Sequence, residues 1–511
     1  MQSEQDPMFV IVDLFCGAGG TTSGFVQAQL NGADLCKVIA CVNHDHNAIK
    51  SHWANHPEVK HYEEDIRTLD LTELTALVAE YRRKYPNAKL ILWASLECTN
   101  FSNAKGGQPR DGDSRTLADH LPRYITALSP DYIQIENVVE FMSWGPLDEE
   151  TGKPVSTKAG QDWVRWKMGI DELGYYNKWA QMNSANYGAY TSRNRLFGCF
   201  AKHDLPIVWP VDTHVKDPLK TKREGTFLKW MPVRDKLDFT DKGLSIFNRK
   251  KPMSDKSYER FYAGCIKFIA KGDTSFISKY YSGRPAGKVN SVDEPAGVIT
   301  TAGNQSLVQV EGEAFLAGYY GNGDNVSGMD QPSPTLTTKD RLAFIQPEPF
   351  IDIHFGNSQN QSIDQPAGTI MTNDKHRLVS AESFILNPSH GGNSHSTDVP
   401  CPVIVARQDK APLYFVQIEQ GKVEIAVYDY DTPIVIKLKE FMVAFGIVDI
   451  KMRMLRVPEL LAIQGFPDDY VLEGTQAEMK KYIGNSVHPM VPKVWAEAMA
   501  EALLVTYKLA A

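Results

Sequence analysis

A cysteine at the end of an apolar run is the first residue whose type and position could do chemistry. The stretch LWASLECTNFSNAKGG (92–107) is apolar through Ala94 and then places Cys98 between Glu97 and Thr99. An isolated cysteine of this kind is usually a small apolar thiol that closes a core strand. It could equally be a nucleophile at the carboxyl end of a parallel strand, where open α/β sheets bind their ligands. These residues alone leave both interpretations open.

Three other stretches place polar groups at strand ends. In FVIVDLFCGAGGTTSGF (9–25), Asp13 and a glycine-rich turn lie between a strand and a helix. The glycines do not have the spacing of a pyrophosphate-binding or P-loop motif, and this favours a nucleoside-type ligand. DYIQIENVVEF ends a strand on Glu136, either a surface acid or one whose pKa is raised toward proton donation. YTSRNRLFGCF puts Arg193 and Arg195 on one strand face, as surface charges or as a clamp for an anion or base.

These groups need a sheet to position them. Short β-rich runs alternate with helical patterns over the first two hundred residues, which predicts a doubly wound, Rossmann-like, mostly parallel sheet. The predicted strands are FVIVDLF (9–15), KVIACVN (37–43), KLILWAS (89–95), DYIQIENV (131–138) and RLFGCFAK (195–202). Helices are predicted over 45–56, 71–85, 114–128, 456–464 and 492–510.

An internal repeat marks the middle of the chain. An Asp-x-Pro turn recurs at spacings of 37, 34 and 34 residues, at Asp293, Asp330, Asp364 and Asp398. An aromatic residue opens each unit, namely Phe276, Phe315, Phe350 and Phe384. Each unit is predicted to be a strand, a polar loop, the turn and a β-branched strand. The array is either structural or a set of loops that reads a polymeric partner.

Composition excludes several classes of protein. The 511 residues suffice for two or three domains, and no apolar run approaches the roughly 20 residues of a membrane span. The start lacks the features of a signal peptide, and the seven scattered cysteines include no Cys-x-x-Cys pair. We therefore expect a reduced, cytoplasmic setting without a disulfide framework or zinc knuckle. The net charge of −8 disfavours nucleic-acid binding, but residues 211–270 hold 14 Lys and Arg against 8 Asp and Glu.

Six motifs taken in order carry a resemblance. DLFCGAGG, ECTNFS, IENV, TSRNR, RVPELLAIQGFP and IGNSVHP resemble the ordered motifs of DNA (cytosine-5)-methyltransferases, over residues 8–205 and about 450–505. The resemblance implies an S-adenosylmethionine-dependent methyltransferase domain at 8–208. A β-rich target-recognition domain with the four repeats would be inserted at 209–445, and 446–511 would complete the catalytic domain. The implied activity is methylation of carbon 5 of a flipped-out cytosine in double-stranded DNA, at a specific sequence.

The resemblance also implies roles for individual residues. Cys98 resembles the nucleophile that attacks carbon 6 of the cytosine. Glu136 matches the acid that holds ring nitrogen 3, Arg195 the cation near the ring carbonyl, and Arg193 its support. The positions implied to bind the cofactor S-adenosylmethionine are Asp13, Phe15, Gly17, Gly19, Asn43, Asp65, Ile66, Asn485 and Ser486. No metal is expected among the site residues.

Three positions depart from the family pattern. Glu97-Cys98-Thr99 replaces the usual Pro-Cys-Gln, and Thr191 replaces a Gln. Asn43 stands where the family has a ribose-binding Glu, and Asp45 follows it two residues later. Two other classes stay open: a DNA-binding protein of this fold with lapsed catalysis, and an enzyme acting on RNA or a free nucleotide. The long recognition block argues against a free nucleotide. The resemblance further implies a monomeric prokaryotic or phage enzyme and leaves open a cognate restriction endonuclease acting separately.

Overall fold

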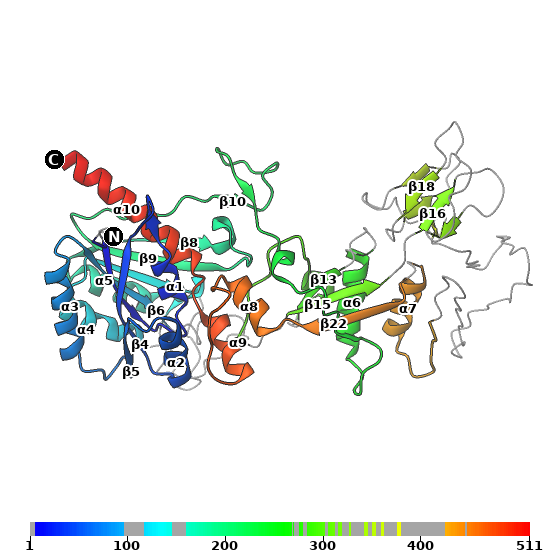
Figure 1. The fold of residues 1–511 in the computed structure, drawn as a ribbon, viewed down its shortest axis with the longest axis horizontal. Coiled ribbons are helices and arrows are strands. Elements are labelled where there is room, and N and C mark those ends of the chain that lie inside the picture. Colours follow the sequence, from blue (N-terminus) through cyan, green and yellow to red (C-terminus); the bar gives the residue numbers. More distant parts are fainter. Residues whose placement is uncertain are drawn as a thin grey trace, which may run out of the picture. The chain divides into compact units, whose positions relative to one another are not determined.

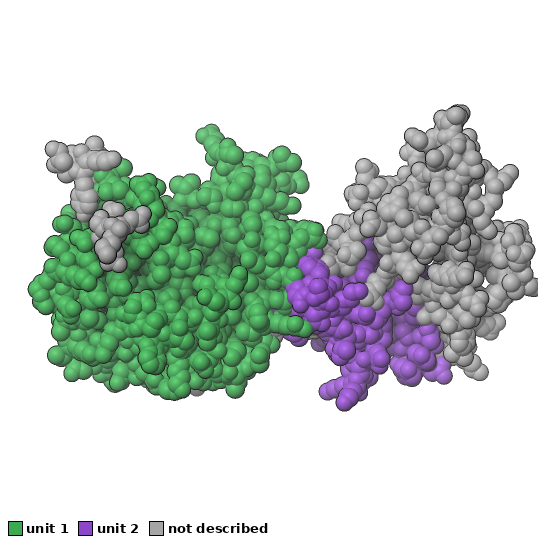
Figure 2. Space-filling model, in the orientation of Figure 1, with its two compact units in different colours: residues 1–237, 293–303, 456–511 green, residues 238–292, 304–455 purple. Residues whose placement is uncertain are grey.

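The chain forms two compact units, which Figure 2 shows in green and purple. The computed structural model describes residues 6–96, 117–145, 160–267, 269, 275–279, 284–301, 305–311, 315–318, 326–328, 342–345, 350–353, 359–361, 376–379, 425–444 and 447–510. Unit 1 comprises residues 1–237, 293–303 and 456–511, and unit 2 comprises 238–292 and 304–455. This division differs from the predicted boundaries after 208 and 445. One reason is that Ala296 donates to the carbonyl of Tyr190 (2.8 Å), which attaches the first Asp-x-Pro segment to unit 1.

A seven-stranded sheet forms the centre of unit 1, in the order β5-β4-β1-β6-β7-β9-β8 (Figure 1). Its strands are β1 (Phe9–Leu14), β4 (Cys36–Asn43), β5 (Lys60–Glu63), β6 (Lys89–Ser95), β7 (Tyr132–Asn137), β8 (Tyr175–Asn183) and β9 (Asn194–Lys202). The first five strands of that order are parallel, whereas β9 runs antiparallel to both β7 and β8. The predicted doubly wound, mostly parallel sheet is therefore confirmed, with all five predicted strands present.

Helices cover both faces of this sheet. The helices of unit 1 are α1 (Gly20–Val26), α2 (His46–Asn55), α3 (Thr72–Lys84), α4 (Leu121–Leu128), α5 (Gln161–Asp171), α8 (Val457–Gln464), α9 (Gln476–Asn485) and α10 (Met490–Ala510). One buried cluster joins one face of the sheet to α3, α4 and α5, and a second joins the other face to α1 and α10. In the second cluster the ring of Trp93 lies edge-on to Phe25 (5.5 Å between centroids) and Trp495 (5.9 Å). The last helix thus packs on the first.

Several helix ends follow from their sequence. Asp45 caps α2 by accepting from the amide of Ala48 (3.2 Å), and Gly465 ends α8 in the left-handed region at φ 85°. Of the helix predicted over 114–128, residues 117–120 form a 3-10 turn before α4, and 114–116 lie outside the described residues. The other four predicted helices are confirmed as α2, α3, α8 and α10.

Unit 2 contains a five-stranded sheet in the order β12-β22-β15-β13-β14 and two helices. These elements are β12 (Leu244–Ser245), α6 (Asp255–Lys267), β13 (Ser275–Lys279), β14 (Val289–Ser291), β15 (Gln305–Glu311), α7 (Pro433–Ala444) and β22 (Asp449–Met454). Phe261 and Phe276 are among the buried side chains that join α6 to the sheet.

The repeat has a structural counterpart in unit 2. The strand that begins near each aromatic residue lies between the two strands that follow it, giving the orders β14-β13-β15, β17-β16-β18 and β20-β19-β21. The added strands are β16 (Phe315–Gly318), β17 (Val326–Gly328), β18 (Leu342–Ile345), β19 (Phe350–Ile353), β20 (Gln359–Gln361) and β21 (His376–Val379). The β-branched strand predicted after Asp293 is wrong, because Ala296 makes only an isolated bridge with Thr191. The fourth repeat lies outside the described residues.

Within the part of the chain that the structure describes, we find no helix with the length and apolarity needed to cross a membrane.

Candidate active site

The glycine-rich turn joins β1 to α1 through three residues with positive φ. Phe15 (59°), Gly17 (53°) and Gly19 (98°) adopt this conformation, which lets the chain reverse direction within six residues. Among the described residues, a Cβ added to Gly17 would meet no heavy atom within 4 Å. The turn therefore presents an open side at Gly17, where the backbone can be approached closely.

Gly19 and Gly20 lie close to residues of the C-terminal segment. A Cβ on Gly19 would collide with the hydroxyl of Tyr470, and a Cβ on Gly20 would lie 2.5 Å from the carbonyl oxygen of Val487. Both glycines are therefore required for close packing of the C-terminal segment on the turn. The tyrosine hydroxyl also donates to the carbonyl of Ala18.

Asp13 lies inside the protein rather than at the open side of the turn. Its side chain is fully buried, and the hydroxyl of Thr22 donates to Oδ2 (2.9 Å). Burial raises the pKa of Asp13 to about 7. This carboxyl is bonded to α1 through Thr22, and its contact with a cofactor stays a prediction.

The end of β4 shows what replaces the family's usual acid. Asn43 accepts a hydrogen bond from the amide of Asp45 (2.9 Å) through its Oδ1. Asp45 itself accepts from Lys481 (3.0 Å) and Tyr482 (2.8 Å), and these partners hold its pKa below the usual range against the opposing effect of burial. Asp45 therefore ties α2 to α9.

The Asp65–Ile66 pair follows β5. Hydrogen bonds from Arg67 lower the pKa of Asp65 to about 2, and the closest contact joins Nη2 to Oδ2 at 2.6 Å. Ile66 is buried, and its carbonyl accepts from the hydroxyl of Tyr124 (2.8 Å). The pair is thus held rigidly, with the acid ionised.

Glu136 and Arg195 meet at the carboxyl end of β7. Arg195 Nε lies 3.4 Å from Glu136 Oε1, and the two side chains are only 17% and 8% exposed. Burial raises the pKa of Glu136, while the charges of Arg193 and Arg195 act in the opposite direction. The structure therefore brings together the predicted acid and the predicted cation.

Arg193 connects this pair to the C-terminal segment. Its guanidinium donates to the carbonyls of Gly484 (3.0 Å) and Asn485 (3.4 Å). Ser486, predicted to lie just before the last helix, is the C-cap of α9, and its carbonyl accepts from the buried side chain of Gln464 (3.0 Å). These bonds hold residues 484–486 beside the start of β9, which Arg193 precedes and which carries Arg195.

The segment that contains Glu97, Cys98 and Thr99 lies outside the described residues. The strand that leads to it is β6, whose last residue, Ser95, pairs with Glu136 in the sheet. Asn137 Nδ2 donates to the carbonyl of Leu96 (3.4 Å), the last described residue before the segment.

Sequence reasoning missed several residues that shape this region. Tyr470 contacts the glycine-rich turn, and Gln464 contacts Ser486. His488 is fully buried against Gly465. Burial and the charge of Arg193 lower the pKa of His488 to about 3. A histidine within IGNSVHP was visible in the sequence, but its partners come from distant parts of the chain.

The sheet and its glycine-rich turn define a doubly wound α/β protein, and comparison with known proteins gives its family. The family model described as "C-5 cytosine-specific DNA methylase" matches residues 9–306 and 350–501. The chain therefore belongs to the C-5 cytosine-specific DNA methylase family, as the motifs predicted.

Individual relatives are more distant. The Type II methylase M.HgiDII of Herpetosiphon aurantiacus is 27% identical over 215 residues, which cover 42% of this chain and 52% of that protein. The Type II methyltransferase M.DdeI of Desulfomicrobium norvegicum is 25% identical over 197 residues, or 39% and 41% of the two chains. The chain spans about half the length of the curated relatives it matches. The solved structure of Entamoeba histolytica methyltransferase EhMeth aligns with a TM-score of 0.43 and 14% identity, covering 98% of this chain and 99% of that one.

Proposed function

We propose that this chain transfers a methyl group from S-adenosylmethionine to carbon 5 of a flipped-out cytosine in double-stranded DNA. Membership of the C-5 cytosine-specific DNA methylase family supports the reaction class. The observation that carries the proposal is the buried pair of Glu136 and Arg195, in register with the end of the strand that leads to Cys98. An acid, a cation and a thiol at one sheet edge are the groups that addition to a pyrimidine ring requires.

Residues around the glycine-rich turn fit a nucleoside cofactor. The open side at Gly17 allows close approach to the backbone, and Phe15, beside it, offers an aromatic ring. The ionised Asp65 can accept from an adenine amino group, and the amide of Asn43 can bond ribose hydroxyls in place of a carboxylate. Bound S-adenosylmethionine would supply an electrophilic methyl group.

The nucleophile would be Cys98. It follows Ser95 by three residues, and three extended residues span at most about 10 Å. Since Ser95 pairs with Glu136, the thiol is within reach of a ring held by that acid. The bond from Asn137 to Leu96 supports this proximity, because it ties the start of the segment to the strand that carries Glu136.

The chemistry then assigns one task to each group. The thiolate of Cys98 adds to carbon 6 of a cytosine that has left the base stack, and carbon 5 becomes nucleophilic. Burial favours the protonated form of Glu136, which can donate a hydrogen bond to ring nitrogen 3. Arg195 lies where its charge can stabilise negative charge on the ring carbonyl. After methyl transfer, loss of the carbon-5 proton and cleavage of the carbon–sulfur bond restore the thiolate.

Unit 2 would select the DNA sequence. Its repeated three-stranded sheets lie outside every segment assigned to the cofactor, and the loop sequences are rich in Asn, Gln, Ser and His, which can bond base edges. The relatives are named Type II methyltransferases, so we include a separate endonuclease with the same target as a partner of this proposal. The monomeric state remains a prediction.

One experiment tests the reaction and the substrate together. Random-sequence duplex DNA, single-stranded RNA and free cytidine nucleotides are each incubated with the chain and S-adenosylmethionine, and 5-methylcytosine is mapped in the products. The proposal predicts methylated cytosines in duplex DNA within one sequence context. Methylation confined to RNA or to the nucleotide would overturn the substrate. DNA binding without methyl transfer would show that catalysis has lapsed.

A further inference from the structure

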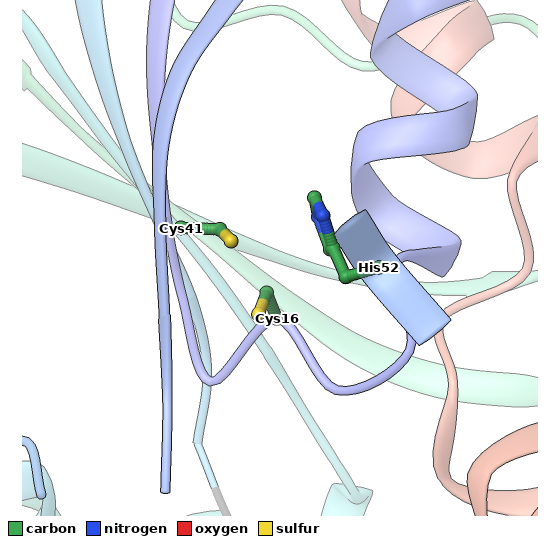
Figure 3. Close-up of side chains that lie close together, drawn as sticks. All are labelled: Cys16, Cys41 and His52. Carbon is green, nitrogen blue, oxygen red and sulfur yellow. The ribbon is translucent and has the colours of Figure 1, made fainter. Parts of the chain in front are cut away.

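Two cysteines and a histidine that the proposed reaction does not use lie together beneath the glycine-rich turn. Cys16 follows β1, Cys41 lies on β4 and His52 on α2, as Figure 3 shows. The two sulfur atoms and one ring nitrogen of His52 all lie within 4.8 Å of one another, and all three residues are buried. The three residues are scattered in the sequence, and the two cysteines do not form a Cys-x-x-Cys pair.

Backbone pairing brings the two thiols together. β1 and β4 are parallel neighbours with Asp13 opposite Cys41, and the amide of Cys16 donates to the carbonyl of Val42 (3.2 Å). The helix that follows β4 then carries His52 back over the same strands. The cluster is therefore positioned by the sheet and a helix, which are rigid supports for a binding site.

Both ring nitrogens of His52 have hydrogen-bond partners. Nδ1 lies 2.9 Å from Nε2 of His61, and Nε2 lies 3.0 Å from the hydroxyl of Thr22. Because Thr22 donates its one proton to Asp13, Nε2–H of His52 donates to Thr22. Metal binding would require this proton to move to Nδ1, which would then donate to His61 and free the lone pair of Nε2. Histidine ligands in metal sites are commonly fixed in this way by a partner on the other ring nitrogen. His61 would then be a positioning residue.

The electrostatic setting favours a cation. Asp13 is paired with Cys41 across β1 and β4, and its Oδ1 is buried without a hydrogen-bond partner among the described residues. A cation here would offset a buried carboxylate as well as the two thiolates formed on binding.

We propose that Cys16, Cys41 and His52 form a zinc site. Zn²⁺ binds well to thiolate and imidazole ligands, whereas Mg²⁺ and Ca²⁺ prefer oxygen ligands. A zinc site with three protein ligands leaves a fourth position for water. Binding would release the two thiol protons to solvent. Because Cys16 lies between Phe15 and Gly17, zinc would tie the proposed cofactor turn to β4 and α2. The proposal rests on the fold of unit 1 and not on methyl transfer.

The test measures zinc affinity of the full chain by chelator competition, and thiolate ligation by the near-ultraviolet charge-transfer band of bound Co²⁺. All proteins carry Cys98→Ala, so that this thiol cannot contribute. We expect the parent to bind Zn²⁺ in the presence of excess Mg²⁺. Cys41→Ser should lose the site and the cobalt band, and His61→Gln should bind about 10–100-fold more weakly. Cys199→Ser is the matched control, since Cys199 is a buried cysteine of the same sheet outside the cluster, and it should behave like the parent.

Three results would overturn the zinc site. They are no zinc binding by the parent, no thiolate band with Co²⁺, or equal affinities in the Cys41→Ser and Cys199→Ser proteins. If Cys41→Ser does not fold, the partly exposed His61 still decides the question, because unchanged zinc affinity in His61→Gln contradicts the proposed ligation of His52. None of these measurements requires methyltransferase activity.

Discussion

Replacing Gly24 by alanine tests whether the C-terminal segment packs on the first helix. Gly24 lies within α1, and an added Cβ would meet the carbonyl oxygen of Pro489 and lie 2.5 Å from Cγ of Pro492. Gly169 lies within α5, where a Cβ would meet no atom of the described part of the chain within 4 Å. Both substitutions gain up to about 1 kcal/mol of helix propensity, but only Gly24→Ala forces overpacking, which costs about 1–3 kcal/mol.

The two variants should therefore differ by about 1–3 kcal/mol in the free energy of unfolding, with Gly24→Ala the less stable. All nine tryptophans lie in the sequence ranges of unit 1, so tryptophan fluorescence during urea titration follows that unit selectively. Gly169→Ala should be as stable as the wild type or slightly more so. Equal stabilities of the two variants would refute the packing of residues 489–492 against α1.

Three further predictions concern the site. Arg193→Met should weaken binding of S-adenosylmethionine in calorimetry and destabilise unit 1 by about 1–3 kcal/mol, because the carbonyl of the buried Gly484 loses its donor and the carbonyl of the exposed Asn485 loses a bond. Arg195→Met, which leaves those bonds intact, is the control for cofactor binding, and equal losses of cofactor affinity would contradict this role. The folded-state pKa of His488 is about 3, so only the unfolded state takes up a proton as the pH falls from 6.5 to 5. The wild type should therefore lose about 2 kcal/mol of stability from this group over that range. His488→Gln should show a smaller loss in urea titrations, and an unchanged loss would contradict the burial of a neutral His488. If Glu97 faces the thiol, its negative charge raises the pKa of Cys98, and Glu97→Gln should let Cys98 react with an alkylating agent at lower pH. Alkylation rates that depend on pH in the same way in both proteins would leave Glu97 purely structural.

The sheet could be predicted from the sequence because its central strands are buried on both faces and form continuous apolar runs, such as KLILWAS in β6. β8 was missed, since the residues of YYNKWAQMN are mostly only partly buried at the sheet edge and show no such run. The site residues Glu136 and Arg195 could be predicted because each lies at a strand end within a recognisable motif. Their contact could not, since it depends on β9 running antiparallel to β7.

Contacts between distant residues account for the rest. Asp45 caps α2, as its place before that helix suggests, but its other partners Lys481 and Tyr482 are more than 430 residues away in the sequence. Cys16, Cys41 and His52 likewise come together only through strand pairing and the return of a helix. A pattern within one segment carries no information on such partners.

The most direct test of the proposed reaction is covalent trapping on DNA that contains 5-fluorocytosine at the mapped target. Fluorine cannot leave carbon 5 as a proton does, so the bond between Cys98 and carbon 6 should persist. With S-adenosylmethionine present, the wild-type chain and the Cys199→Ala control should form a complex that survives denaturing electrophoresis, and Cys98→Ala should form none. A trapped complex with Cys98→Ala, or none with a wild type that methylates the same DNA, would contradict the assignment of Cys98 as the nucleophile.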